Sequence, residues 1–412
     1  MPLNHSLSIA RDPGIARSAK REARSTAMLR IVRKAERSPP VYTALQKSHA
    51  RETPFDDMML THRNAEVREG VREVQFQKQQ KKGRVRMKSS ILRSLIFFVA
   101  ALAWTRADAS EYVLKFAHPA PVTDPAHEAI ELFAKDVEER SKGRINVEVF
   151  PGGQLGEARE IIQALQSGVT EAAFFSSTHL VTFAPEFGLF DLPYLVVDRG
   201  EVGPLLEGEI GSELLSGLNK INIKGLAFSE ASFRSLFANR PADNLDALKG
   251  LKIRVPGSPV YLGTVQAMGA LPTPIAFGEL YSALQQGIVD GAENTASAYF
   301  TYRFYEVAPN WIATNHSLMP GVYLMSARFW EKLPEDLQVI VQDAAKRAAL
   351  FHREKEWAAA QSSLEQAKAK GASLHVLKDV DKLVVEVHKL YPQFSQSIGE
   401  DLVARTMKSL GR

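Results

Sequence analysis

The chain has 412 residues, which is long enough for two or three domains. Apolar residues make up 45% and charged residues 24%, a globular composition that excludes a chain disordered throughout. Because the sequence contains no cysteine, disulfides, thiolate nucleophiles and cysteine-ligated zinc or iron–sulfur sites are excluded.

The net charge of +4 combines two parts of opposite charge. Residues 1–109 hold 22 Lys and Arg against 10 Asp and Glu, whereas residues 110–412 hold 29 against 37. The globular part is therefore acidic and would repel a polyanion, so we expect no nucleic-acid partner.

A secretory signal peptide is predicted at about 87–109. It has a basic start, an apolar run and a signal-peptidase site, which are Met87-Lys88 with Arg93, residues 95–104, and Ala107-Asp108-Ala109. The apolar run would span roughly 15 Å as a helix, against a bilayer core of roughly 30 Å, and no later apolar segment is long enough to span one. A buried core helix and an uncleaved anchor are the alternatives. We expect an exported mature chain that begins at Ser110.

Residues 1–86 differ in chemistry from the rest. They are rich in Arg, Lys, Ser and Gln and show no sustained hydrophobic period. Too little apolar surface is available there to offset chain entropy, so we predict a disordered basic extension. Since the signal peptide lies far from Met1, translation is expected to start at Met87, which would leave residues 1–86 untranslated.

The mature part alternates predicted strands with predicted helices. Strand patterns cover 112–117, 145–150, 171–175, 223–228 and 251–255, and helix patterns cover 124–141, 157–167, 260–268 and 278–287. In the first of these helices, Asp124 supplies the N-cap and Pro125 the first helical position. The regular alternation predicts an α/β fold with mostly parallel sheets.

The pattern at 334–370 predicts a helix of unusual length. Pro334 opens it, Gly371 ends it, and apolar residues recur at helical spacing along one face. At 1.5 Å per residue such a helix would extend about 55 Å, whereas a 150-residue domain has a radius of gyration of about 15 Å. We therefore expect the helix to span two lobes. A break or kink, for which Ser362-Ser363 is the candidate position, is the alternative.

We predict that the chain crosses between the two lobes more than once, because no Pro-rich linker separates them. Residues 110–231 with about 320–359 are assigned to the first lobe, and about 232–319 with 360–412 to the second. Several crossings make a hinge, and the cleft between two such α/β lobes is the expected ligand site.

Known catalytic and cofactor motifs are missing from the sequence. It holds no G-x-S-x-G elbow, no H-E-x-x-H, no phosphate loop and no complete G-x-G-x-x-G. Asp290 and Glu293 could form an acid–base pair, but their spacing fits a solvated face better. His118, His127 and His316 lack metal-ligand spacing. We expect no catalytic residue, no metal and no cofactor, with a secreted enzyme acting on a small organic acid as the alternative.

Arg254 has the sequence setting that best suits a ligand contact. It lies in an apolar strand pattern that Pro256 ends, and the C-terminal end of a strand is where open α/β sheets bind ligands. A guanidinium there can hold a carboxylate by two parallel hydrogen bonds. Arg234 and Arg240 precede it along the chain. The alternative for Arg254 is an arginine satisfied by an internal Asp or Glu.

Short motifs follow one another in consistent order over nearly all of residues 111–400. They are PGGQLG at 151–156, DLPY at 191–194, NR at 239–240, GLKIRVP at 250–256, LPTP at 271–274, LQQGIVDGAEN at 284–294 and LPEDLQ at 333–338. Together they resemble the solute-binding proteins of TRAP (tripartite ATP-independent periplasmic) transporters, of the dicarboxylate-binding type.

The resemblance implies a fold of the periplasmic-binding-protein type, with two α/β lobes that close over an organic acid and a long helix bridging them, and it implies that the mature protein lies in the periplasm. It implies that Arg254 grips the ligand carboxylate, that Arg234 supports the ligand, and that Asn294 adds a polar contact. By the same resemblance, Phe277 supplies an aromatic wall and Arg159 matches an arginine near the cleft.

The far end of the ligand is less defined by the resemblance. Pro119 and Ser176 stand where members that bind sialic acid carry Asn and Glu, so we do not expect a sialic-acid ligand. Ser176 is a candidate polar contact, as are Ser177, His118 and His127, although each could equally be a cap or a core residue.

The predicted function is the capture of a small organic carboxylate, such as a C4-dicarboxylate or a sugar acid, for a TRAP-type secondary transporter. The expected partners are this anion and the membrane subunits of the transporter, and a monomer is expected. A ligand-binding receptor for a sensor kinase is a further alternative.

Overall fold

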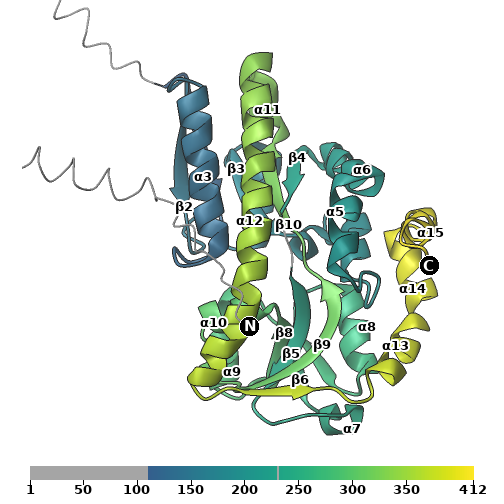
Figure 1. The fold of residues 1–412 in the computed structure, drawn as a ribbon. Helices are drawn as coiled ribbons and strands as arrows, with labels where there is room; N and C mark the ends of the chain where they lie inside the picture. Colours follow the sequence, from purple (N-terminus) through teal and green to yellow (C-terminus); the bar gives the residue numbers. More distant parts are fainter. Residues whose placement is uncertain (1–109, 230–231) are drawn as a thin grey trace, which may run out of the picture. The chain divides into compact units, whose positions relative to one another are not determined.

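The structure is a computed structural model that describes residues 110–229 and 232–412 (Figure 1). The predicted basic extension at 1–86 and the predicted signal peptide at about 87–109 lie outside the described residues. In the part of the chain that is described, none of the helices combines the length and the apolar character needed to cross a bilayer.

The strands of the described residues form two sheets, one of five strands and one of six. The first sheet has the order β2-β1-β3-β10-β4 and the second the order β11-β9-β5-β8-β6-β7. The strands are β1 Tyr112–Ala117, β2 Ile145–Phe150, β3 Ala172–Ser176, β4 Ile223–Phe228, β5 Phe233–Ala238, β6 Lys252–Val255, β7 Leu271–Pro274, β8 Gly291–Asn294, β9 Asn310–Leu318, β10 Gly321–Ser326 and β11 Ser373–Val376. We call each sheet, with the helices that cover it, a lobe.

Both sheets are mixed, and among the described strands parallel pairs outnumber antiparallel ones by five to four, so the prediction of mostly parallel sheets holds by a narrow margin. Parallel pairs join β1 to β2 and β3, β6 to β7 and β8, and β9 to β11. Antiparallel pairs join β10 to β3 and β4, and β5 to β8 and β9. Every antiparallel pair contains β5 or β10, and each of these strands follows directly on a strand of the other sheet, β5 on β4 and β10 on β9.

The helices alternate with the strands as the sequence predicts. They are α3 Pro125–Arg140, α4 Ala158–Ser167, α5 Arg199–Glu207, α6 Glu209–Gly217, α7 Leu245–Leu248, α8 Pro259–Ala267, α9 Leu280–Gln285, α10 Ala296–Thr301, α11 Ala327–Lys332, α12 Glu335–Ala369, α13 Val380–His388, α14 Tyr391–Ile398 and α15 Glu400–Ser409. Short 3-10 turns include η1 Ser177–Leu180, η2 Pro185–Asp191 and η4 Phe277–Glu279. Asp124 caps α3 by accepting a hydrogen bond from the Ala126 amide, which confirms the predicted start.

Helix α12 runs unbroken from Glu335 to Ala369, and the alternative of a break at Ser362-Ser363 is wrong (Figure 1). The Ser362 hydroxyl donates to the carbonyls of Ala358 and Ala359 on the preceding turn, so its polar group is satisfied inside the helix. The helix packs against α3 and β4 in the first lobe and against α10 and β11 in the second. It therefore spans both lobes, as its length predicts.

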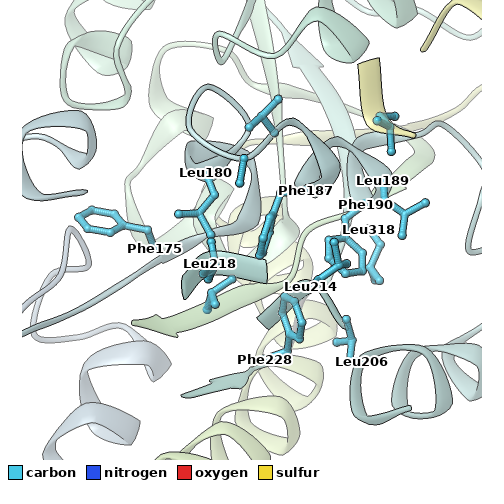
Figure 2. Close-up of a cluster of buried hydrophobic side chains, with 14 of the residues drawn as sticks. Phe175, Leu180, Phe187, Leu189, Phe190, Leu206, Leu214, Leu218, Phe228 and Leu318 are labelled. Atoms are coloured by element: carbon cyan, nitrogen blue, oxygen red, sulfur yellow. The ribbon is translucent and has the colours of Figure 1, made fainter. Parts of the chain in front are cut away.

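Each sheet is covered by apolar clusters on both faces. In the first lobe, α3 and the first half of α12 cover one face through residues such as Phe133 and Val341. Figure 2 shows the cluster on the other face, where Phe187, Phe190 and Phe228 pack edge to face or tilted. In the second lobe, α8 and α13 cover one face, and α9, α10 and the end of α12 cover the other.

The C-terminal helices contact more than one cluster. Helix α13 packs with the second sheet through Leu383 and Val387. Helices α14 and α15 instead contribute Tyr391, Phe394 and Leu402 to the cluster of Figure 2, next to η2. This cluster also includes Val260 of α8 and Leu318 of β9, so α14 and α15 pack where elements of both lobes meet, and the predicted lobe boundaries stay a prediction.

Candidate functional site

A cavity of about 130 Å³ lies between the two lobes and beside the middle of α12. The first lobe contributes residues that include Pro119, Asp124 and Ser176, and the second contributes Arg234, Arg254, Phe277 and Asn294. Helix α12 contributes His352 and Glu356. The cavity thus combines side chains from segments that lie far apart in the sequence, and it includes most of the predicted site residues.

Arg254 reaches the cavity because of strand alternation. Successive side chains of a strand point to opposite faces, and Ile253 and Val255 join the apolar cluster under α8. Arg254 therefore lies on the other face of the second sheet. Its register partner on β8 is Ala292, and Asn294 lies two residues further along β8. Arg254 and Asn294 thus share one face of the sheet.

Arg254 is a buried cation with only one hydrogen bond among the described residues. Its side chain is 2% exposed, and its Nε donates to the carbonyl oxygen of Ile275 at 2.8 Å. Its two terminal nitrogens have no partner in residues 110–229 or 232–412, and its guanidinium lies 5.8 Å from the centre of the Phe277 ring. Burial lowers the pKa of Arg254 to about 10, with Glu293 opposing the shift and Arg234 adding to it. The group therefore stays charged at neutral pH, without a carboxylate of its own.

Arg234, in contrast, is held by an internal acid. Leu236 and Glu293 are register partners, so Arg234, two residues before Leu236, lies on the same face as Glu293. The guanidinium contacts both Glu293 carboxylate oxygens and donates to the Glu293 carbonyl at 2.9 Å. Burial alone would lower the pKa of Arg234, but the adjacent Glu293 carboxylate outweighs it and holds the pKa above its usual range. The alternative considered for Arg254, an arginine satisfied by an internal Asp or Glu, therefore describes Arg234.

The same pair corrects the expectation for Asp290 and Glu293. Glu293 is fully buried and has a His316 ring nitrogen at 3.6 Å, so it does not belong to a solvated face. Asp290 accepts a hydrogen bond from the Lys252 amide, which ties β8 to β6. Burial raises the pKa of Glu293, but Arg234 more than offsets burial and the pKa is lowered. Both acids therefore have internal partners.

A bulge in β9 fixes the position of Arg234. The pairing of β5 with β9 shifts between Arg234 and Leu236, and Asn315 takes a positive φ of 44° at this point. The Ser235 hydroxyl accepts hydrogen bonds from the amides of Thr314 and Asn315 and contacts the Asn315 side chain at 3.0 Å. Bulges are common beside binding sites, and this one lies on the strand that pairs with β5 next to Arg234.

Three of the other predicted contacts, Asn294, Ser176 and Phe277, line the cavity, whereas the further candidate Ser177 does not. Asn294 is buried at the end of β8, and Ser176 ends β3 with its hydroxyl 3.0 Å from the His179 ring. Phe277 packs edge to face on Tyr302 with ring centroids 4.8 Å apart. Arg159 also does not line the cavity, because the apolar residues of α4 are buried and Arg159 lies on the exposed side of this helix.

The two histidines considered as polar contacts contact each other instead. The His118 Nε2 atom lies 3.1 Å from the His127 Nδ1 atom, and neither residue lines the cavity. Burial, and then the neighbouring His127, lower the pKa of His118 to about 4. In residues 110–229 and 232–412, no group of three His, Asp or Glu side chains is arranged to hold a metal ion.

Two acidic residues of the cavity were missed by the sequence analysis. Glu356 is 7% exposed and accepts a hydrogen bond from the Ser297 hydroxyl, and Asp124 lines the cavity in addition to capping α3. Burial, and then Asp124, raise the pKa of Glu356 to about 7, and burial raises that of Asp124 to about 6. The sequence held one sign that Glu356 is buried. His352 and Glu356 are polar, yet they lie at helical spacing in line with the apolar residues of α12.

Glu356→Gln is expected to raise the free energy of unfolding of the ligand-free protein by roughly 3 kcal/mol at pH 8. The folded pKa of about 7 exceeds the ordinary value of 4.5, and one pKa unit corresponds to about 1.36 kcal/mol. A raised carboxyl pKa costs stability as the pH rises from the unfolded pKa to the folded pKa, so the gain should stay below about 1 kcal/mol at pH 5. Urea denaturation at both pH values measures the difference.

Glu354→Gln is the matched control, because Glu354 lies exposed on the same helix and should change stability little at either pH. A gain for Glu356→Gln that is equal at pH 5 and pH 8 would contradict the raised pKa.

A second cavity of about 230 Å³ adjoins the first and shares Pro119, His179, Phe277 and Tyr302 with it. The glycine-rich loop at 151–156 lines this second cavity from the first lobe. Across it, a Cβ added to Gly278 would lie 2.5 Å from the Glu157 carboxylate. The two lobes therefore approach each other closely at this place.

Two α/β lobes, a helix that spans both and a buried, uncompensated cation between them define a two-lobed ligand-binding protein. The sequence matches the model of one family over residues 116–395, and the chain belongs to that family, the bacterial extracellular solute-binding proteins of family 7. The predicted family and the predicted two-lobed α/β fold are thereby confirmed.

Individual relatives agree with this assignment. The C4-dicarboxylate-binding periplasmic protein DctP of Rhodobacter capsulatus is 34% identical over 255 residues, which cover 61% of this chain and 74% of that protein. A TRAP periplasmic solute-binding protein of Chromohalobacter salexigens with bound D-glucuronate has a TM-score of 0.70 and 28% identity, covering 72% of this chain and 99% of that one. Another, of Sulfurospirillum deleyianum with bound succinate, has a TM-score of 0.69 and 33% identity, covering 72% and 98%. These relatives bind solutes and are not described as enzymes.

Proposed function

We propose that this protein captures a small organic carboxylate in the periplasm and delivers it to the membrane subunits of a TRAP-type transporter. One observation carries the proposal: Arg254 is buried at the cavity with both terminal nitrogens unpaired among the described residues. A buried charge is costly unless it is paired, so this guanidinium is suited to an incoming carboxylate, which it can hold by two parallel hydrogen bonds.

The rest of the cavity supports a small anion. Asn294 and Ser176 add polar groups, and Phe277 forms a wall beside the guanidinium. Arg234 lines the same cavity, and its pair with Glu293 makes it a positioning residue more than a source of free charge. When the lobes close and exclude water, the lower dielectric strengthens the hydrogen bonds between Arg254 and the ligand.

The relatives support the same conclusion about the ligand and the compartment. One is named for C4-dicarboxylate binding in the periplasm, and the solved structures hold D-glucuronate or succinate. The proposed export by a signal peptide at about 87–109 agrees with that location.

A thermal-shift screen over organic acids tests the proposal. A ligand that binds only the folded state adds about 2.7 kcal/mol at a concentration of 100 times Kd, so a bound acid should raise the Tm by several degrees. The same acid should raise the Tm of Arg254→Ala much less. If no acid among C4-dicarboxylates, sugar acids, oxo acids and aromatic acids stabilises the protein, the proposed function is wrong.

A further inference from the structure

The charged groups of the cavity can be counted from the described residues that line it. The ionisable groups other than Tyr302 are two arginines, two carboxyls and two histidines. Burial lowers the pKa of His179 and of His352 to about 4, so both histidines are neutral at the pH of the periplasm. Arg234 is compensated by Glu293. Arg254 is therefore the one cation of this set that is free to compensate a ligand charge.

The two carboxyls form a separate acidic part of the cavity. Burial raises the pKa of both carboxyls; Asp124 further raises that of Glu356, while the Ala126 amide and His127 oppose the shift of Asp124. The charges that act on Arg254 are instead those of Glu293, Arg234 and Glu157. Neither Glu356 nor Asp124 has a Lys or Arg partner in residues 110–229 and 232–412. Their hydrogen bonds come from neutral donors, the Ser297 hydroxyl and the Ala126 amide.

We infer that the cavity is built for a ligand with a single carboxylate and several hydroxyl groups, and that Glu356 and Asp124 select against a second carboxylate. This inference rests on the proposed function and narrows its ligand to the class of aldonates and uronates. The carboxylate binds Arg254, and the hydroxyls donate to Glu356 and Asp124.

Hydroxyl groups suit this cavity better than an ammonium group or a plain alkyl chain does. The lining around the acidic part includes Thr295 and Ser297, whose hydroxyls lie 3.1 Å apart, and Asn294 and Ser176 lie elsewhere in it. Such groups both donate and accept hydrogen bonds, as a polyol does, whereas an ammonium group has no acceptor. A dicarboxylate would bring a second negative charge with no free cation to meet it, and like charges placed together oppose binding.

Pairs of ligands that share a hydroxyl pattern but differ in the number of carboxylates test the effect of charge alone. D-Gluconate and D-galactonate differ from D-glucarate and galactarate only in carrying a terminal alcohol in place of the second carboxylate. Isothermal titration calorimetry at pH 8, where Glu356 is ionised, should show that the better aldonate binds at least about tenfold more tightly than its matching aldarate. D-Galacturonate and succinate complete the set, and succinate should bind more weakly than the best sugar acid.

Two variants test whether Glu356 causes the selectivity against a second carboxylate. Glu356→Gln removes the charge and keeps the size, so it should narrow the ratio of aldonate to aldarate affinity several-fold, while the exposed Glu354→Gln should leave the ratio unchanged. An unchanged ratio in Glu356→Gln would overturn the assignment.

The outcomes separate this inference from the proposed function. Tighter binding of succinate or of the aldarates by the wild-type protein, lost in Arg254→Ala, would overturn the inference and leave the proposed function standing. If none of these acids binds and the wider thermal-shift screen is also negative, both are wrong.

Discussion

Arg254→Ala should weaken binding of the carboxylate ligand by about 30-fold to several thousand-fold. Truncating one partner of a buried, hydrogen-bonded charge pair costs on the order of 2–5 kcal/mol, and each 1.4 kcal/mol is a factor of ten in Kd. The effect is large because Arg254 is 2% exposed and donates to the protein only from Nε, so both terminal nitrogens remain for the ligand. Isothermal titration calorimetry with the acid found by the thermal-shift screen measures the loss.

Two further variants sharpen this test. Arg254→Lys should lose only part of the affinity, because an ammonium keeps the charge but not the two parallel donors. Arg240→Ala is the matched control, since Arg240 belongs to the same cationic stretch of sequence but lies exposed and bonds to the Lys249 carbonyl. Wild-type affinity in Arg254→Ala would remove Arg254 from the site.

Arg234→Met is expected to lower the free energy of unfolding of the ligand-free protein by about 3–5 kcal/mol. Removing one partner of a buried ion pair leaves the other buried and uncompensated, and Glu293 is fully buried. Urea denaturation measures the change. The loss should grow as the pH rises, because the pKa of Glu293 would rise in the variant and its deprotonated form would then be favoured mainly in the unfolded state.

The double variant Arg234→Met/Glu293→Gln provides the control for this prediction. With no charge left unpaired, it should recover much of the stability, since neutral replacements of a buried pair are often tolerated. If the double variant is as unstable as the sum of two independent losses, the coupling between Arg234 and Glu293 is absent.

Much of the fold could be predicted from local patterns. The helix that starts at the Asp124 cap, the strand around Arg254 and the continuous helix from Glu335 to Ala369 all follow from periodicity, capping residues and length. The antiparallel strands β5 and β10 could not be predicted, because local patterns do not reveal that the chain passes directly from one sheet to the other before each of them.

The sequence could predict which residues belong to the candidate site, but not which of their charges are paired. Arg234 and Arg254 look alike in the sequence, yet only strand register places Glu293 beside Arg234 and Ala292 beside Arg254. Glu356 lies more than 200 residues after Asp124, and only the packing of α12 brings both to one cavity. Local sequence patterns do not reveal which charged side chains tertiary packing brings together.

Helix α12 also acts as a strut, because its two halves are embedded in the apolar clusters of different lobes. Rotation of one lobe must tilt this strut or be absorbed where β4 passes to β5 and β9 to β10. Glu356 lies near the middle of the strut and Arg254 on a sheet of one lobe, so any rotation changes the separation of the acidic and basic groups. The angle between the lobes would therefore set the distance between the acidic and basic groups, and with it the length of ligand that fits between them.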